Sequence, residues 1–459
     1  MRYACSILFS LFFSAASAQV FKLDTLRYNG ESETRINFVI LSDGYLKSQL
    51  PEFIEDATDF TRSLLNTRPF NHYENYFNVF AISVPSNEEG AARDPSNLID
   101  NYFGSTFNFA GIDRLLVPTR DDRILEVLAD YFPLYNQVVM LVNSPKYGGS
   151  GGWVATASTN VSANEIAIHE VGHSFGFLSD EYWAGPQYAG ESPNMTRETS
   201  RLRVKWAPWI DNQGIGIYPH TGDANWKKPH RDCKMQFLGS PFCVVCKEQF
   251  IHRIHFLTSS IEDFSPQSAE SVNDNLEFSI TTIRPKPYSL DINWQLDEED
   301  LGVSENVLTL DPELLVNDVH KLSVNVMDLT TQNKRKTLYV STVTWTISTD
   351  ITSKRSKGFF ERTEDEPVLN VEEVISNNLS ISIFPNPSSE QLFIEHEGLN
   401  NDFVTFKILD INGKEIKVKT LKGGQSGQSI LNIRNLNSGV YILQIKNDRI
   451  NQTIRFIKE

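Results

Sequence analysis

HEVGHSFGFLSDEY, residues 169–182, places two histidines four positions apart with a glutamate directly after the first. On an α-helix, residues i and i+4 project from one face about one turn apart, so His169 and His173 can present two imidazoles to one cation. Ser162 and Glu165 fit a capping box before the motif. Apolar residues also recur there at helical spacing: Ile166, Ile168, Val171 and Phe175. The stretch therefore predicts a helix that carries a metal site.

Glu170 follows the first histidine, where a carboxylate takes a proton from metal-bound water instead of binding the metal. This is the arrangement of gluzincin and metzincin hydrolases. We therefore expect His169 and His173 to bind one Zn²⁺ ion and Glu170 to be the general base.

Zinc in a hydrolase needs a third protein ligand. Gly176 is placed to end the helix and turn the chain back. The metzincin spacing would put the ligand at Ser179, but a hydroxyl is a poor zinc ligand, so Asp180 is the first choice and Glu181 the second. The alternative role for either acid is to orient an imidazole through a hydrogen bond.

Met235 lies 62 residues after His173, in a position compatible with the methionine that metzincins place beneath their histidines. Core filling is the alternative for a lone methionine. Tyr182, Tyr218 and His230 are candidate donors to an oxyanion by residue type, and each also suits a structural role. The glycine-rich segment 147–158 is suited either to pair with an extended peptide or to form a tight turn.

The first eighteen residues have the features of a cleaved secretory signal: a basic start, an apolar run over 7–13 and an A-S-A site over 16–18. Cys5 would leave with it, which leaves Cys233, Cys243 and Cys246 in the mature chain. In an oxidising compartment we expect one local disulfide among these three and one free thiol. A three-thiolate metal site is the alternative, although no fourth ligand is evident in the sequence.

The chain of 459 residues is too long for one core, so several domains are expected. Loss of the signal leaves 41 basic against 58 acidic residues, a net charge of about −17, which argues against nucleic acid as a partner. No apolar stretch is long enough to span a bilayer.

Residues 19–262 are expected to form an α/β (α+β) zincin-like catalytic domain. Its apolar, β-branched runs predict strands and its amphipathic runs predict helices. The expected strands cover 36–45, 76–84, 136–144 and 147–158, and the expected helices cover 51–66, 120–132 and 162–177.

Short alternating strands over 265–349 predict a β-sandwich, Ig-like in type, that serves as a packing or spacer module. Residues 350–379 are charged, lack a clean period and are interpreted as a linker. Residues 380–459 return to strands and turns, and the Asn412-Gly413 dipeptide between two alternating runs predicts a hairpin.

This last segment resembles the C-terminal sorting domain of the type IX secretion system. The resemblance rests on F-P-N-P (384–387), D-I-N-G-K (410–414), L-x-S-G-V-Y-I-L (436–443) and a basic final strand. It implies the type IX machinery as a partner, passage through the periplasm and outer membrane, and a product that is released or attached to the cell surface. The alternative is an adhesive β-domain.

A second resemblance covers roughly residues 30–255. The motif of 169–182, L-S-D-G-Y (41–45), C-K-M (233–235) and F-C-V-V-C (242–246) are similar to the IgA-peptidase family of zinc metallopeptidases. The resemblance implies a zinc endopeptidase with the ligands and base named above. It does not imply immunoglobulin A as the substrate, because a fold and its chemistry do not fix specificity.

The sequence therefore predicts a secreted zinc endopeptidase that acts on protein or peptide substrates. One alternative is a surface adhesin or glycan-binding protein with a non-catalytic metal domain, and Glu170 argues against it because a scaffold has no need of a base. The other is a zinc hydrolase of a non-peptide bond.

Overall fold

The computed structural model describes residues 20–266, 276–316, 319–334 and 340–348. Nearer the C-terminus it describes 370–373, 380–384, 391–397, 403–410, 415–422, 426–437, 439–446 and 451–458. The expected signal peptide and most of the expected linker lie outside these ranges. Among the described residues, no helix is both long and apolar enough to cross a membrane.

A six-stranded sheet with the order β1-β3-β2-β4-β6-β5 forms the centre of the first part of the chain. The four inner strands are parallel, and the two edge strands β1 and β5 run antiparallel to their neighbours. The strands are β1 Lys22–Arg27, β2 Ile36–Asp43, β3 Phe77–Ser83, β4 Gln137–Val142, β5 Gly149–Gly151 and β6 Val154–Ser158. Every residue of β2, β3, β4 and β6 is buried, as expected for parallel strands covered on both faces.

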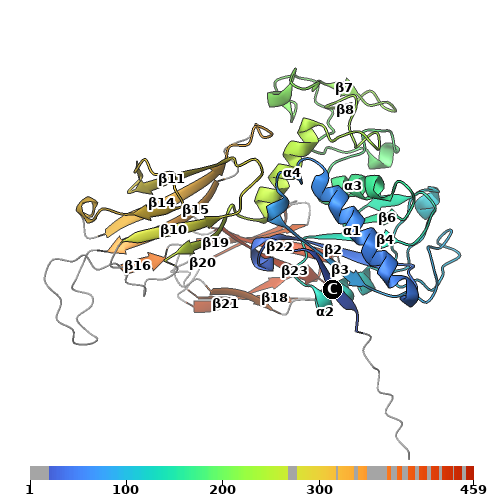
Figure 1. The fold of residues 1–459 in the computed structure, drawn as a ribbon, viewed down its shortest axis with the longest axis horizontal. Coiled ribbons are helices and arrows are strands. Elements are labelled where there is room, and N and C mark those ends of the chain that lie inside the picture. The colour runs from blue at the N-terminus through green and yellow to red at the C-terminus, as the bar shows by residue number, and fades with distance from the viewer. Residues whose placement is uncertain are drawn as a thin grey trace, which may run out of the picture.

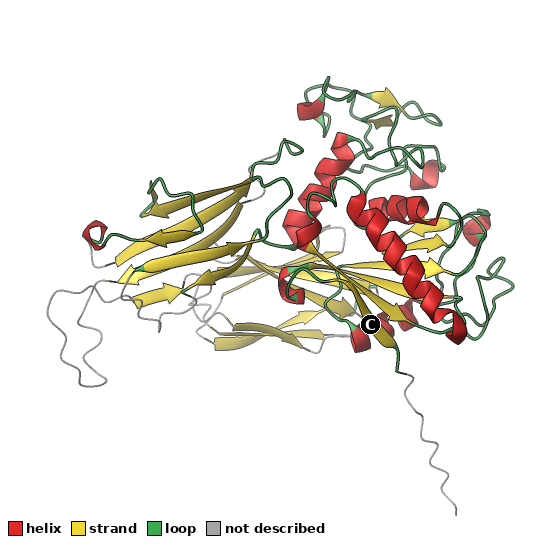
Figure 2. Cartoon of the chain, viewed as in Figure 1, coloured by secondary structure: helices red, strands yellow, loops and turns green. Residues whose placement is uncertain are grey.

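Helices cover both faces of this sheet (Figures 1 and 2). α1 Leu50–Asn66, α3 Ala163–Ser174 and α4 Val244–Leu257 share one core with Phe38 and Ile40 of β2. α2 Asp121–Tyr131 shares the opposite core with Val39 and Leu41 of the same strand. The strands and helices predicted for this part are thus confirmed. Strand β1, helix α4 and a short two-stranded pair, β7 Tyr218–Pro219 and β8 Lys227–Lys228, were not predicted.

Two further sheets share a core that includes the stacked rings of Trp294 and Trp345. One contains β9 Ile261–Ser265, β10 Glu277–Thr282 and β13 Val307–Thr309. The other contains β11 Leu290–Leu296, β12 Glu299–Asp300, β14 Val319–Asp328, β15 Val340–Ser348 and β16 Asn370–Glu373. β16 differs from expectation because it lies inside the predicted linker, where its backbone pairs with β15.

The last part of the chain contains strands in two sheets around a fourth core. The first sheet has β17 Ser380–Phe384, β18 Gln391–Glu397 and β21 Ser426–Asn432. The second has β19 Phe403–Asp410, β20 Glu415–Lys422, β22 Gly439–Lys446 and β23 Asn451–Lys458. β19 and β20 pair antiparallel on either side of Asn412-Gly413, as the hairpin prediction requires, although the turn itself lies outside the described residues.

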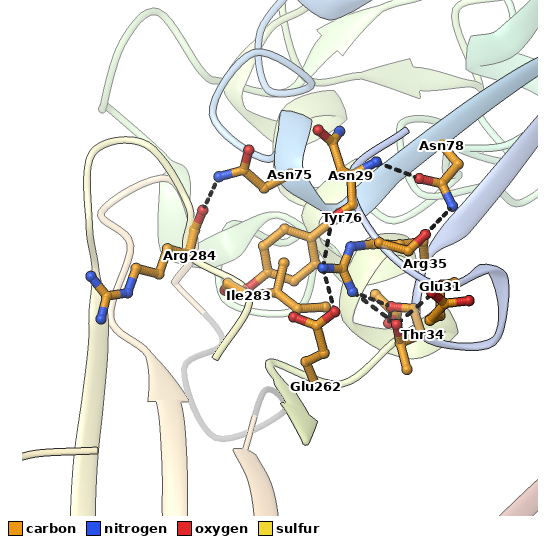
Figure 3. Close-up of polar contacts among 12 residues, drawn as sticks. Asn29, Glu31, Thr34, Arg35, Asn75, Tyr76, Asn78, Glu262, Ile283 and Arg284 are labelled. Atoms are coloured by element: carbon orange, nitrogen blue, oxygen red, sulfur yellow. Dashed lines mark hydrogen bonds and ion pairs between the residues drawn. The ribbon is translucent and has the colours of Figure 1, made fainter. Parts of the chain in front are cut away.

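Polar contacts join the first sheet to the segment around β9 and β10 (Figure 3). The buried Arg35 guanidinium donates to Glu262 Oε1 at 2.8 Å. The Tyr76 hydroxyl donates to the Ile283 carbonyl at 2.7 Å, and the Asn75 amide donates to the next carbonyl, that of Arg284. These contacts come from the residues that directly precede β2 and β3.

Asp328, the fully buried last residue of β14, forms a second polar junction. Its carboxylate accepts hydrogen bonds from the Tyr73 hydroxyl (2.5 Å), Ser289 Oγ (2.7 Å) and the Thr330 N–H (2.9 Å), and His255 Nε2 lies 3.0 Å away. Burial alone would raise the pKa of Asp328, but the hydrogen bonds from His255, Tyr73 and Ser289 hold it below its ordinary value. Tyr73 and His255 belong to the first part of the chain, so this one carboxylate connects two cores.

Replacing Asp328 with Asn is expected to destabilise the protein by about 3 kcal/mol at pH 7, because donors that now bond a carboxylate would lose a charged acceptor. Because the pKa of Asp328 is lower in the folded than in the unfolded chain, its charge stabilises the fold fully at pH values above the unfolded pKa of about 3.9. This stabilisation is lost as the pH falls through the folded pKa. Urea unfolding midpoints at several pH values test this, with Asp59→Asn, an exposed residue of α1, as the control. The assignment of Asp328 as a charged, stabilising acceptor would be contradicted if Asp328→Asn lost no more stability than the control. It would also be contradicted if the loss of stability grew below about pH 4.

Candidate metal centre

Helix α3 follows β6 and carries both histidines of the motif. His169 is 6% exposed, and its Nε2 lies 3.2 Å from His173 Nε2. The helix begins after Ser162 as predicted, but the expected capping box is not formed. Glu165 instead accepts hydrogen bonds from Lys234 Nζ and the Gly239 N–H, so it ties the start of the helix to a distant turn.

Each imidazole is held by a backbone carbonyl. His169 Nδ1 lies 3.0 Å from the Lys234 carbonyl oxygen, and His173 Nδ1 lies 2.7 Å from that of Leu178. A carbonyl only accepts hydrogen bonds, so Nδ1 carries the proton in both rings. Both Nε2 lone pairs are then free to bind a cation at the same point.

Asp180 completes a triangle of ligand atoms. Its Oδ1 lies 3.1 Å from His169 Nε2 and 3.2 Å from His173 Nε2. Zinc bonds of about 2.0–2.1 Å in tetrahedral geometry place neighbouring ligand atoms about 3.3–3.4 Å apart, so these three atoms fit one face of a zinc tetrahedron. Burial would lower the pKa of His173, but the neighbouring Asp180 carboxylate raises it to about 9.

Glu181, the second choice for the third ligand, lies elsewhere. Its side chain is fully buried and its Oε1 lies 3.8 Å from Cys246 Sγ. The structure thus directs two neighbouring acids to different sites, Asp180 to the histidines and Glu181 to the cysteines.

Glu170 lies beside the triangle rather than in it. Its Oε2 is 4.0 Å from His173 Nε2, which is farther than the Asp180 oxygen. Burial raises the pKa of Glu170, although the neighbouring histidines oppose the shift. The carboxylate is therefore close enough to exchange a proton with a group bound at the triangle.

Two glycines of the motif are explained by close packing. A Cβ on Gly172 would lie 2.6 Å from Met235 Sδ, so the buried Met235 packs directly against the helix behind the histidines. A Cβ on Gly176 would lie 2.6 Å from the Phe250 ring. The helix does end near Gly176, but the left-handed residue of the turn is Phe177, so Gly176 is required for space rather than for its backbone angles.

A cleft of about 1440 Å³ opens in front of the triangle. Of the three candidate oxyanion donors, Tyr182 lines it, whereas Tyr218 and His230 lie outside its lining. The Tyr182 ring stacks on His169, and the Arg114 guanidinium lies 5.4 Å above the same ring. Burial raises the pKa of Tyr182, so its hydroxyl stays protonated and able to donate.

Sequence reasoning missed Arg114 and His220. Arg114 comes from a loop with no motif, and His220 Nε2 lies 3.3 Å from the backbone oxygen of Asp180, 40 residues earlier. Only the tertiary fold brings these residues to the site.

The edge strand β5 forms one wall of the cleft. The Leu116 N–H donates to the Gly149 carbonyl, and the Gly149 N–H donates to the Arg114 carbonyl. The segment 114–116 therefore occupies the first part of the edge that peptide pairing, one of the two predicted roles, would use. Gly152, beyond this part, also lines the cleft.

The predicted disulfide is not formed. Cys233, Cys243 and Cys246 are buried free thiols, with Sγ atoms 3.6 Å apart for 243 and 246 and 3.7 Å apart for 233 and 246. A disulfide bond is about 2.05 Å long. The short spacing and the turn at the start of α4 bring the sulfur atoms to a common point without bonding any pair.

Comparison with known families places this site in context. Residues 25–224 match the family model of IgA Peptidase M64, and residues 382–459 match that of the secretion system C-terminal sorting domain. Both resemblances noted in the sequence are thereby confirmed. The first match suggests a peptidase, and the second indicates type IX secretion to the medium or the cell surface. The peptidase match ends before the cysteines.

Comparison with individual proteins adds little. No curated protein matches the chain. Among solved structures, dimeric latent PorU from Porphyromonas gingivalis is similar at 12% identity and a TM-score of 0.17, over 43% of this chain and 19% of that one. The Bacteroides ovatus mixed-linkage glucan protein SGBP-B is similar at 12% identity and a TM-score of 0.12, over 42% of this chain and 65% of that one. This chain thus spans less than two thirds of either structure, and both structural similarities are weak.

Gly151 of β5 supports His173 and offers a direct test of the centre. A Cβ at 151 would lie 2.3 Å from His173 Cβ, whereas a Cβ at Gly152 would meet nothing within 4 Å. We expect Gly151→Ala to displace the imidazole and weaken zinc binding about 10- to 100-fold, as loss of ligand support usually does. Gly152→Ala should bind zinc like the wild type. Zinc retention against a competing chelator measures both, and equal retention by the two variants would contradict the proposed role of His173.

Proposed function

We propose that this chain is a secreted zinc endopeptidase that hydrolyses peptide bonds in protein substrates. The observation that carries the proposal is the triangle of His169 Nε2, His173 Nε2 and Asp180 Oδ1, with sides of 3.1–3.2 Å and Glu170 buried beside it. In this interpretation residues 19–262 form a zincin-like catalytic domain. Residues 265–349 form an Ig-like β-sandwich, and 380–459 form the sorting domain joined by the linker 350–379.

His169, His173 and Asp180 would hold one zinc ion at the cleft, which all three residues line. Zinc bound there would lower the pKa of a bound water toward about 7 and polarise the scissile carbonyl. The carbonyl groups of Lys234 and Leu178 keep both histidines in the tautomer that this requires.

Glu170 would take a proton from the attacking water and deliver it to the leaving amine. Its burial supports this role, because burial raises the pKa of Glu170 and so makes its carboxylate a stronger base than an exposed one. Its distance from the triangle supports proton transfer rather than metal binding.

Tyr182 would donate a hydrogen bond to the oxygen of the scissile carbonyl as negative charge develops there. Three observations support it: the residue lines the cleft, its ring is fixed between His169 and Arg114, and its raised pKa keeps the hydroxyl protonated. The open part of the β5 edge near Gly152 would bind the substrate backbone as an added strand.

The two alternatives predict different activities. A surface adhesin or glycan-binding protein has no use for a buried base beside a ligand triangle. A zinc hydrolase of another bond would use the same centre, so a panel of protein and glycan substrates separates it from a peptidase.

Glu170→Gln tests the base. We expect the variant to keep its zinc and to lose about 10²- to 10⁴-fold in turnover of a denatured protein mixture, because the amide cannot accept the proton. The control is Glu126→Gln, at an exposed position of α2 on the opposite face of the sheet, which should leave both the zinc content and the turnover unchanged. Full activity of Glu170→Gln would remove the residue from the mechanism, and an inactive wild type that holds zinc would favour a different substrate class.

Asp180→Ala and Ser179→Ala test the third ligand, because the metzincin spacing would favour 179 and the structure favours 180. We expect Asp180→Ala to lose the catalytic zinc at least 10-fold more readily to a chelator, since only two ligands remain. Ser179 binds Asn194 through its backbone, so Ser179→Ala should retain zinc. The reverse order of zinc loss would show that the serine position supplies the ligand.

A further inference from the structure

A second cluster of metal-binding residue types lies apart from the cleft. It consists of Glu181, Cys233, Cys243 and Cys246, whose ligand atoms all lie within 4.8 Å of one another. All four residues are buried, and the most exposed of them, Cys243, is 7% exposed. None of them lines the cleft in front of the histidines.

The distances in this cluster fit a bound zinc ion. Cys246 Sγ lies 3.6 Å from Cys243 Sγ, 3.7 Å from Cys233 Sγ and 3.8 Å from Glu181 Oε1. Zinc–sulfur bonds of about 2.3 Å in tetrahedral geometry place neighbouring sulfur atoms about 3.8 Å apart. The sulfur atoms are thus spaced for one metal ion and too far apart for a disulfide.

The Glu181 carboxylate independently indicates a cation-binding role. Its Oε1 accepts a hydrogen bond from Asn194 Nδ2, but its Oε2 is fully buried and has no hydrogen-bond partner among the described residues. A buried carboxylate oxygen without a hydrogen-bond partner is costly, so buried carboxylates are normally fully hydrogen-bonded, ion-paired or bound to a metal. Lys228, also buried, interacts electrostatically with Glu181 and Cys233 and would offset part of the negative charge of the ligands.

The local backbone also suits thiolate ligands. Cys243 is the N-cap of α4 and Cys246 lies in its first turn, so two sulfurs sit where the helix end favours negative charge. The Cys243 N–H donates to Cys233 Sγ at 3.3 Å. An exported chain with three cysteines would leave one reactive thiol after forming a disulfide, whereas one metal ion uses all three.

We propose that Glu181, Cys233, Cys243 and Cys246 bind a second zinc ion with a structural role. Four protein ligands close the coordination shell, as in structural rather than catalytic zinc sites. This proposal does not rest on the peptidase activity, since every ligand lies outside the cleft.

The second site would hold parts of the first in place. Glu181 directly follows Asp180, and its N–H donates to the Met235 carbonyl at 2.8 Å. Cys233 starts the turn that contains Met235 and also Lys234, whose carbonyl holds His169. A metal at the cysteines would therefore fix both the third catalytic ligand and the turn that supports the first histidine.

Metal content of the purified full-length chain tests the proposal. We expect two zinc ions per chain in the wild type, one in His169→Ala/His173→Ala and one in Cys243→Ser/Cys246→Ser. Substitution of cobalt for zinc gives a readout that needs no activity, because thiolate ligands produce intense sulfur-to-cobalt charge-transfer absorption. This absorption should persist in the histidine variant and vanish in the cysteine variant.

Glu181→Gln covers the case in which the cysteine variant fails to fold, because it keeps all three thiols. We expect its structural zinc to be lost to a chelator about 10- to 100-fold more readily. The control is Glu248→Gln, a buried glutamate of α4 that accepts a hydrogen bond from Trp209 outside the cluster. Its two zinc ions should be retained as in the wild type.

Three results would overturn the proposal. One is a wild-type chain that holds a single zinc ion and loses it in the histidine variant. Another is a cobalt-loaded wild type without thiolate absorption. The third is an intact-mass or peptide analysis that finds a disulfide between any two of the three cysteines in the secreted protein. Any of these results would contradict the second site but not the proposed peptidase centre at His169 and His173. Conversely, absence of cleavage activity alone would not contradict the second site.

Discussion

The convergence of His169 Nε2, His173 Nε2 and Asp180 Oδ1 on one point is the constraint on which the arrangement of the cleft depends. Two of them come from one turn of α3, but the imidazole planes are set from outside the helix, by the carbonyls of Lys234 and Leu178. The third comes from Asp180, after the helix has ended. Helix α3, the loop that follows it and the turn near 234 must therefore be placed together to within a few tenths of an ångström.

Close packing supplies that precision. Met235 lies against the bare backbone at Gly172, and the edge strand β5 approaches His173 so closely that Gly151 has no room for a side chain. Parallel strands buried on both faces carry α3 and β5 as a rigid unit, because every inner strand is covered by helices. Polar junctions at Arg35 and Asp328 then attach this unit to the neighbouring sheets without entering the cleft.

The sequence was informative where function depends on local periodicity. Four-residue spacing was enough to place His169 and His173 on one helical face, and alternating or continuous apolar runs located the main strands. It failed where long-range packing decides. The predicted capping box does not form because Glu165 instead pairs with Lys234, 69 residues away. The predicted disulfide was wrong because the spacing of cysteines in the sequence gives no information on the distances between their sulfur atoms. Arg114 and His220 carry no local signal at all.

Asp180 and Glu181 show why the third ligand was ambiguous in the sequence. Both are acids at nearly the same sequence separation from the histidines, and no local sequence pattern indicates which of the two side chains faces the imidazoles. The geometry favours Asp180 as the proposed ligand, because Glu181 contacts Asn194 and Cys246 instead of the histidines. Two adjacent carboxylates thus face two separate clusters, and the backbone between them transmits any shift of one to the other. A change that moves Glu181 would therefore reach Asp180 through a single peptide bond, although no residue of the cysteine cluster lines the cleft.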